Sequence, residues 1–326
     1  MSKNNQLRHI VLGAVIVLLV LALLYSGLRI LESTVLSKGS APQEAPRKTV
    51  TYNGKEYFPR QDITVLLAVG IDEEGPVVPS QSYRNSGEAD MIALVVLDQT
   101  AKTYTVLCLN RDTMAYIPVL GLGGKPAGSV VGQLALSHTY GTGMEDSAEN
   151  TKNAVSAYLG GIDIDYYAAM NIDGIGLLND LAGGVTVNIT EDFSLVDPDL
   201  PMGTVTLDSK QAMTYVRSRK DVGTQLNLSR MERHKEYLQG LAAALTDQAE
   251  ENDSFISKAW ERLSDYMVTD CSVNALTGIA NRCADYTLAD ILSPKGENVM
   301  GNEFYEFYAD ESDLQSIIFS LFYAPK

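Results

Sequence analysis

The chain of 326 residues is 45% hydrophobic and 20% charged, which is typical of a globular protein with enough apolar side chains to form a core. Its formal net charge of −16 argues against nonspecific binding to nucleic acid, which requires a basic surface. With three cysteines, three histidines and no CxxC or HExxH pattern, a structural zinc site is not expected either.

The first predicted element is a membrane-spanning helix. Residues Ile10 to Leu28 form a run of nineteen residues without a charge, enough to cross about 30 Å of hydrocarbon. A cleaved signal peptide is the alternative, but its apolar region is usually about 7–15 residues long and ends at a small-x-small site. No such site follows here, so we predict an uncleaved, single-pass anchor in the cell membrane. Basic residues flank it on both sides, so the positive-inside rule does not fix the orientation by itself. The short head (residues 1–9) and the large body that follows favour an orientation with the bulk of the chain extracellular.

We predict that residues 29–60 form an extracellular linker, because "SKGSAPQEAPRK" is rich in Pro, Ser and charge and has no apolar period. The folded body, residues 61–326, begins with mostly apolar runs that are typical of strands buried on both faces. The first ends at Asp72, the second spans Asp90 to Asp98, and the third spans Thr103 to Asn110, with "QTAK" as a hairpin turn between the last two.

Helical patterns and further strands alternate along the rest of the body. Glycine pairs at 160–161 and 183–184 are typical of helix ends. After residue 253 we expect a helical extension with one strand, "EFYEFYA". This alternation predicts an α/β fold, a layered α/β/α domain with a central mixed β-sheet. Capping boxes are expected from Asp146 with Glu149, Asp208 with Gln211, and Ser229 with Glu232.

Basic side chains gather in "YVRSRKDVGTQLNLSRMERH". Arg217 ends one helix, where the dipole favours a cation, and Arg219 fits a solvated loop. Arg230 and Arg233 come early in the next helix, where the dipole disfavours cations by ~0.3–1 kcal/mol each, and they repel each other on one face. An anion bound between them at the helix start would reverse both effects, and guanidinium groups suit phosphate. A solvated basic face and a phosphate site both remain open on these residues alone.

Acidic side chains are expected at the same edge of the sheet. Open α/β sheets bind ligands beyond the carboxyl ends of their strands. Asp72 ends the first strand, and Arg111 and Asp112 follow the third. Asp90 joins this edge if the first two strands are antiparallel. Two aspartates near arginines suit a pyrophosphate with a magnesium ion, although Asp112 could simply cap a turn.

Motifs throughout the first part of the body resemble one family. The arginine-aspartate pair after the third strand, the double glycine before "VTV", and R-x-R followed by R-x-x-R are its specific features. They occur within segments that follow the order of the LytR-CpsA-Psr (LCP) domain over about residues 63–245: "TVLLAVGID", "ADMIALVVLD", "VLCLNRDTM", "LSHTYGTG", "IDIDYYAAMNIDGIGLLNDLAGGVTVNI", "LDSKQAMTYVRSR" and "LSRMERHKEYL".

The resemblance implies an envelope phosphotransferase. Such an enzyme takes a glycopolymer from a polyprenyl-pyrophosphate carrier and attaches it to peptidoglycan through a phosphodiester bond. By position, Asp72 and Asp90 would hold Mg²⁺, and an apolar cavity between sheet and helices would hold the prenyl tail. The implied catalytic residues are Asp90, Arg111, Arg217 and Arg219, and the implied pyrophosphate-binding residues are Arg111, Arg217, Arg219, Arg230, Arg233 and His234.

The chain departs from the family pattern at several positions. Glu88-Ala89-Asp90 stands where the family usually has R-S-D, Asn227 replaces an aspartate, and His234 replaces a glutamine. Arginines often found after the R-D pair are absent from "TMAYIPV". We hypothesise that Arg84, in the preceding loop, replaces the arginine lost at Glu88. From the residue types alone, His138 and His234 are interpreted as hydrogen-bonding residues.

Two other functions remain open. One is a hydrolase that releases the prenyl carrier to water. The other is a non-catalytic anchored protein that binds polyprenyl phosphates, which the loss at Glu88 and Asn227 favours. A cytoplasmic head of nine residues argues against a DNA-binding regulator. Cys271 and Cys283 could pair in an exported body, and the sequence names neither the glycopolymer nor the acceptor sugar.

Overall fold

The structure, a computed structural model, describes residues 49–223, 227–251, 255–272, 275, 278–279, 282–283 and 286–326. The predicted head, the anchor at 10–28 and the first part of the linker lie outside these residues. Within the described ranges, no helix combines the length and the apolar character needed to cross a membrane.

The centre of the fold is a six-stranded sheet in the order β11-β8-β3-β4-β5-β12. Strand β4 runs antiparallel to both of its neighbours, whereas β8 is parallel to β3 and β12 is parallel to β5. The sheet is therefore mixed, as the sequence predicts. Its strands are β3 (Ile63–Ile71), β4 (Ala89–Asp98), β5 (Thr103–Leu109), β8 (Tyr166–Asn171), β11 (Met267–Thr269) and β12 (Thr287–Leu292).

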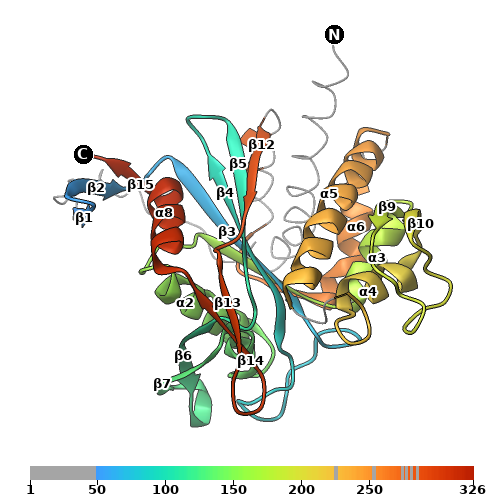
Figure 1. Ribbon diagram of the computed structural model, residues 1–326, viewed down its shortest axis with the longest axis horizontal. Helices are drawn as coiled ribbons and strands as arrows, with labels where there is room; N and C mark the ends of the chain where they lie inside the picture. Colours follow the sequence, from blue (N-terminus) through green and yellow to red (C-terminus); the bar gives the residue numbers. More distant parts are fainter. Residues whose placement is uncertain are drawn as a thin grey trace, which may run out of the picture.

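Helices cover both faces of this sheet (Figure 1). Because successive side chains of a strand point to opposite faces, Leu66 joins one buried apolar cluster while its neighbours Val65 and Leu67 join the other. The cluster of Leu66 includes side chains of α3 (Asp173–Leu181), α4 (Ser209–Arg217), α5 (Asn227–Glu251) and α6 (Phe255–Leu263). The cluster of Val65 includes side chains of α2 (Glu145–Tyr158) and α8 (Glu311–Phe322).

Smaller sheets surround the central one. The hairpin of β1 (Val50–Tyr52) and β2 (Lys55–Pro59) pairs with β15 (Tyr323–Pro325) at the other end of the chain. Residues 50–59 thus form strands, although the sequence assigns them to the linker. The remaining pairs are β6 (Met114–Leu120) with β7 (Pro126–Gln133), β9 (Val185–Ile189) with β10 (Gly203–Leu207), and β13 (Gly296–Met300) with β14 (Tyr305–Ala309). Short 3₁₀ helices are η2 (Leu122–Gly124), η3 (Leu134–Thr139) and η4 (Ser264–Tyr266).

The part after residue 253 differs from the predicted helical extension. It contains α6 and α8, but it also supplies β11 and β12, which are the two edge strands of the central sheet. Strand β12 consists of partly buried and exposed positions and has no continuous buried run. An edge strand is only partly buried, so its sequence carries a weaker strand pattern than β3 to β5.

Helix starts are only partly as expected. Asp208 caps α4, and the capping box with Gln211 is confirmed. The box at Asp146 is wrong, because the N-cap of α2 is Met144 and the Asp146 carboxylate accepts hydrogen bonds from the preceding loop. The box at Ser229 is also wrong, because α5 already includes Asn227 and Ser229 therefore lies inside the helix.

Candidate active site

The end of β3, the start of β4 and the end of β5 meet at one edge of the central sheet. Gly70 pairs with Met91 in the antiparallel register of β3 and β4, so Asp72 and Asp90 lie at the same edge. Ile92 pairs with Leu109, which brings Arg111 there as well. The antiparallel pairing of β3 and β4, on which the expected position of Asp90 depends, is thus confirmed.

Asp90 is the centre of the cluster at this edge. One of its carboxylate oxygens accepts from Nη1 of Arg111, and the other lies 2.6 Å from Nη1 of Arg230. Arg111 also forms an ion pair with Glu88, one of the positions where the chain departs from the family pattern. The Arg230 side chain is only 3% exposed, so its charge must be balanced inside the protein.

Asn227 holds Arg230 from the other side. Its Oδ1 accepts from Nε and Nη2 of Arg230 at 3.0 and 2.7 Å, and its Nδ2 donates to Oδ1 of Asn110 at 2.7 Å. Burial, together with the nearby charges of Arg111 and Arg219, lowers the pKa of Arg230 to about 10. The cations therefore repel one another at this point, and a bound anion would relieve that repulsion.

Arg217 and Arg219 lie beside this cluster, at and just beyond the end of α4. Arg217 pairs with Asp72 (Nε to Oδ1, 2.9 Å) and with Glu74 (Nη1 to Oε1, 2.7 Å), and its side chain is 45% exposed. Arg219 has no ion pair or hydrogen bond with the described residues, yet its charge lowers the pKa of Arg230. Arg219 is thus available to a ligand, and the exposed Arg217 could bind one by exchanging an acidic partner for it.

Arg233 is instead held within the fold. Its Nη1 donates to Tyr215 O at 2.6 Å, its Nη2 donates to Ser218 O, and its Nε lies 3.0 Å from the Glu191 carboxylate. The guanidinium also lies 5.3 Å from the centre of the Phe193 ring. Both terminal nitrogens thus donate hydrogen bonds and the charge is paired with Glu191, so a role in pyrophosphate binding would require these contacts to break.

His234 is held in a similar way, by the end of α4. Its Nε2 lies 2.8 Å from Val216 O, which can only accept, so this nitrogen donates. Burial lowers the pKa of His234 to about 3, which keeps the ring neutral. His234 and Arg233 thus bind carbonyl groups that the last turn of a helix leaves without partners, and through them α5 positions Arg217 and Arg219.

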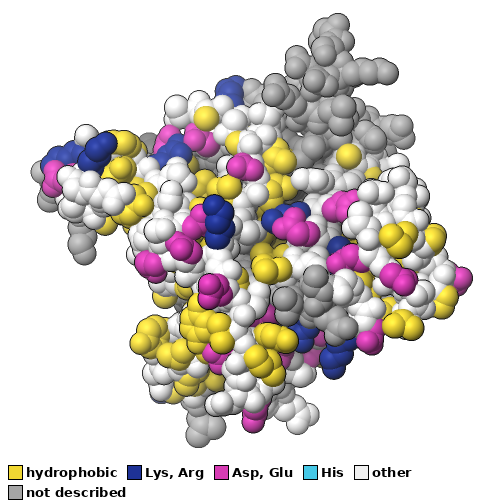
Figure 2. All heavy atoms as spheres, viewed as in Figure 1, with side chains coloured by type: hydrophobic (Ala, Val, Ile, Leu, Met, Phe, Trp, Pro, Cys, Tyr) yellow, Lys and Arg dark blue, Asp and Glu magenta, His cyan; other side chains and the backbone are white. Residues whose placement is uncertain are grey.

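Arg84 is not brought into this cluster. Its guanidinium stacks on the ring of Tyr140, 4.0 Å from the ring centre, and it forms no ion pair within the described residues. The position of the lost arginine is instead occupied by the Glu88 carboxylate, which binds Arg111. Lys and Arg side chains on the face shown in Figure 2 are interspersed with Asp and Glu, so that face offers no extended basic patch.

A family model matches residues 25–321 of the chain. The chain belongs to the LytR_cpsA_psr family. A relative from Enterococcus faecalis (strain ATCC 700802 / V583), named polyisoprenyl-teichoic acid–peptidoglycan teichoic acid transferase TagU, is 28% identical over 284 residues, which cover 86% of this chain and 84% of the relative. The protein of the same name from Bacillus subtilis (strain 168) is 24% identical over 285 residues, 83% of this chain and 78% of the relative.

Solved structures share the fold of this LytR_cpsA_psr protein. Bacillus subtilis TagV matches with a TM-score of 0.61 and 23% identity over 80% of this chain and 96% of that chain. A structure described as TagT bound to LI-WTA matches with a TM-score of 0.59 and 22% identity over 80% of this chain and 90% of that one.

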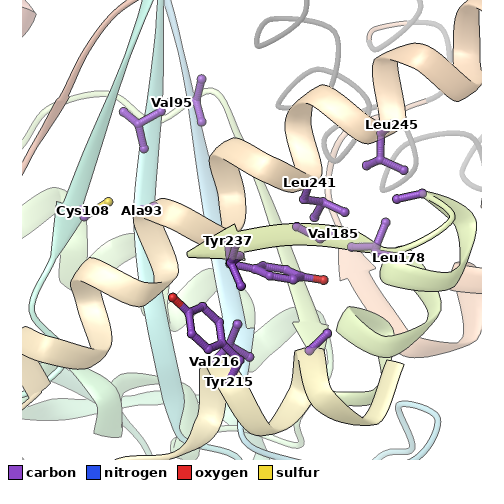
Figure 3. Close-up of a cluster of buried hydrophobic side chains, with 14 of the residues drawn as sticks. Ala93, Val95, Cys108, Leu178, Val185, Tyr215, Val216, Tyr237, Leu241 and Leu245 are labelled. Atoms are coloured by element: carbon purple, nitrogen blue, oxygen red, sulfur yellow. The ribbon is translucent and has the colours of Figure 1, made fainter. Parts of the chain in front are cut away.

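An apolar cavity lies between the sheet and α5 in this family member. Its lining includes Ala93 and Val95 on the sheet and Tyr237 and Leu241 on α5, whose side chains are labelled in Figure 3. Two spaces, of about 50 and 100 Å³, share the lining residues Gly70, Met91, Met170, Ile175 and Leu238. Both spaces are small beside the pockets of about 300–1,000 Å³ that hold drug-sized ligands, so a long lipid chain fits only if α5 moves.

The first of these spaces ends at the charged cluster. Asp72, Asp90, Arg217 and His234 line it together with apolar side chains such as Met91. The charged cluster thus lies at one end of the cavity, whereas the second space is lined mainly by apolar side chains, together with Lys235 and Gln239. This arrangement is complementary to a molecule with an anionic head and an apolar tail.

Asp72 and Asp90 offer the ligand chemistry that Mg²⁺ requires. Both are oxygen donors at the same cavity end, and Mg²⁺ is usually bound by one or two carboxylates together with substrate phosphates. Among the described residues, no group of three or more acidic, histidine or cysteine side chains could hold a metal by itself. Because Asp72 pairs with Arg217 and Asp90 pairs with Arg111 and Arg230, a metal ion would share these carboxylates with the arginines and take its remaining ligands from phosphates.

Proposed function

We propose that this chain is a phosphotransferase that moves a glycopolymer from a polyprenyl-pyrophosphate carrier onto peptidoglycan through a phosphodiester bond. One observation carries the proposal: the arginine and aspartate cluster lies at the end of the apolar cavity under α5. Relatives named polyisoprenyl-teichoic acid–peptidoglycan teichoic acid transferases support this class of donor and acceptor.

The arginines would bind the two phosphoryl groups. Arg217 and Arg219 are accessible, and Arg111 becomes accessible when the exposed Glu88 side chain turns away. Guanidinium groups bind phosphoryl oxygens in pairs and stabilise the charge that develops on them during transfer. Asp90 fixes Arg111 and Arg230 relative to each other through its two oxygens, so the cationic groups are oriented before the substrate binds.

The reaction exchanges one phosphorus–oxygen bond for another. A hydroxyl oxygen of the acceptor attacks the phosphorus that carries the glycopolymer, and the bond from this phosphorus to the bridging oxygen breaks. Polyprenyl phosphate leaves with the bridging oxygen, and Asp72 or Asp90 accepts the hydroxyl proton. Mg²⁺, held by these two aspartates and the phosphates, would neutralise charge on the phosphoryl oxygens. The anchor predicted at residues 10–28 would keep this site at the membrane that contains the carrier.

The test uses the full-length chain with a polyprenyl-pyrophosphate-linked sugar, a soluble peptidoglycan fragment and Mg²⁺. Mass spectrometry should detect a phosphodiester-linked product that disappears with EDTA and in Arg217→Ala, a partly exposed position where the variant should still fold. The matched control is Lys220→Ala, which removes an exposed charge three residues along the chain. Consumption of the donor without a linked product would instead indicate the hydrolase, and an intact bound donor would indicate a non-catalytic binding protein.

A further inference from the structure

A polar groove lies on the opposite face of the sheet from the apolar cavity. It has a free volume of about 540 Å³ and runs between the segment 73–87 and the loop that precedes α2. Ile71, at the end of β3, lines both the groove and the cavity. The two spaces therefore approach each other at the edge of the sheet where Asp72 and Asp90 lie.

The groove is held open by hydrogen bonds that do not depend on a ligand. Ser80 N donates to Thr142 O at 2.7 Å, which ties one wall to the other. Asn85 Nδ2 lies within 3.1 Å of His138 O, Gly141 O and Ser147 Oγ. With both walls bonded in this way, the groove exists before any ligand binds, which lowers the entropic cost of binding.

His138 is a buried group in the groove whose hydrogen bonding is incomplete. Its side chain is 3% exposed, and its Nδ1 lies 3.0 Å from Gly87 O. Since a carbonyl only accepts, Nδ1 carries the hydrogen, and Nε2 is left with a lone pair. Nε2 is buried and has no partner among the described residues. Burial lowers the pKa of His138 to about 4, so the ring is neutral and Nε2 remains an acceptor.

The other polar groups of the groove favour a neutral, hydroxyl-bearing ligand. Glu73, Glu74 and Arg84 line the groove. The two carboxylates outnumber the one guanidinium and disfavour an anion, and all three side chains can form hydrogen bonds with hydroxyl groups. Glu73 already accepts one from Ser86. Gly87, which holds His138, is next to Glu88, and the Glu88 carboxylate binds Arg111. Glu74, which lines the groove, also forms an ion pair with Arg217, so the groove borders the arginine cluster on the side opposite to the apolar cavity.

We infer that this groove binds the acceptor, a hydroxyl-bearing sugar of a glycan chain, and that His138 Nε2 accepts a hydrogen bond from one of its hydroxyl groups. The inference rests on the proposed function for the identity of the second substrate. It assigns the two substrates to opposite faces of the sheet, with the lipid under α5, the glycan beside α2, and the pyrophosphate between them.

The test measures transfer by the full-length chain while the acceptor, a soluble peptidoglycan oligosaccharide, and the lipid-linked donor are varied separately. Ser80→Trp places a large ring in the groove, and Gln81→Trp, one residue away and outside the groove, is its control. His138→Asn keeps a donor for Gly87 O and removes the acceptor at Nε2. We expect Ser80→Trp to raise the KM for the acceptor at least tenfold, and His138→Asn to raise it about three- to tenfold, the value of one hydrogen bond. The donor KM should stay within about twofold, and Gln81→Trp should behave as the wild type.

Two results would overturn the inference. In one, Ser80→Trp raises the KM for the donor instead, which would assign the groove to the sugars of the donor. In the other, it changes neither constant. Calorimetry with the acceptor oligosaccharide alone tests binding in the groove independently of the proposed transfer reaction. A protein that lacks transferase activity but binds the oligosaccharide, and loses that binding in Ser80→Trp, would refute the reaction and leave the groove supported.

Discussion

At the scale of single residues, acidic side chains form ion pairs with the arginines of the site and compete with a ligand for them. Glu88 is 40% exposed at its side chain and binds Arg111, which is 10% exposed. A phosphoryl group must displace this carboxylate before it can bind Arg111. Glu88 stands where the family pattern has an arginine. It therefore removes one cation from the site and also competes with the substrate for Arg111.

Glu88→Gln should therefore strengthen donor binding. Removing the competing charge frees Arg111, and partly exposed ion pairs contribute up to about 1 kcal/mol, so the KM for the donor should fall about two- to fivefold. Steady-state kinetics with varied donor would measure this. Glu56→Gln, which breaks the remote pair with Lys326, controls for the change in net charge. An unchanged or raised KM in Glu88→Gln would mean that Glu88 does not compete with the donor.

At the scale of secondary structure, α5 both covers the apolar cavity and holds the end of α4. Tyr237 and Leu238 line the cavity, and Arg233 and His234, on the preceding turn, bind the carbonyl groups of Tyr215, Val216 and Ser218. Movement of α5 to admit a longer lipid would therefore act on α4. We expect Arg217 and Arg219 to shift when the tail enters.

One pair of variants can test whether Arg233 has a structural role and Arg219 a role in substrate binding. Arg233→Gln breaks a buried ion pair with Glu191 and leaves carbonyl groups unpaired, which should cost about 3–5 kcal/mol. At ~2–4 °C per kcal/mol, the melting temperature should fall by about 10 °C. Arg219→Gln removes the same charge from a side chain that has no partner among the described residues, so it should melt as the wild type but lose most of its transfer activity. Thermal unfolding and the transfer assay together would decide, and equal melting temperatures would refute the structural role of Arg233.

At the scale of the whole molecule, the two ends of the described chain stabilise each other and complete the fold. Strand β15 pairs with β2, and Phe319 of α8 stacks on Tyr52 with ring centres 4.1 Å apart. The last 73 residues, counted from 254, also contain both edge strands of the central sheet. The domain therefore cannot be reduced to the motif core at 63–245 without losing the sheet edges.

Stability should fall as the solution becomes mildly acidic. His138 and His234 have pKa values lowered to about 4 and about 3 in the folded chain, against about 6.5 when unfolded. Below pH 6.5 the unfolded chain therefore binds more protons, and each histidine approaches a loss of about 1.4 kcal/mol per pH unit. The stabilising contribution is complete above pH 6.5 and is lost as the pH falls toward 4.

Urea unfolding at pH 7, 6 and 5 would measure this dependence. His234→Gln keeps a donor near Val216 O without a titrating group, so it should remove about half of the loss between pH 7 and 5. His138→Asn should remove a similar share. Equal stability of the wild type at pH 7 and pH 5 would contradict the buried, neutral state of both rings.

Much of this protein follows from the sequence by itself. The apolar runs predict β3, β4 and β5, because strands buried on both faces leave a continuous apolar pattern. Asp72, Asp90 and Arg111 are found at one sheet edge, because their positions at the strand ends and an antiparallel second strand determine it. Family membership also follows from the order of the motifs, which depends only on the chain.

Only the tertiary structure decided which arginines are held inside the fold and which are accessible. Arg230 and Arg233 share a helix face and a residue type, but the partners that distinguish them, Asp90 and Glu191, come from distant parts of the chain. The edge strands β11 and β12 and the acceptor lone pair of His138 were equally undetermined by local pattern. Each depends on what another segment places beside it, and partners as far apart in the chain as Gly87 and His138 or Asp90 and Arg230 leave no periodicity in the sequence.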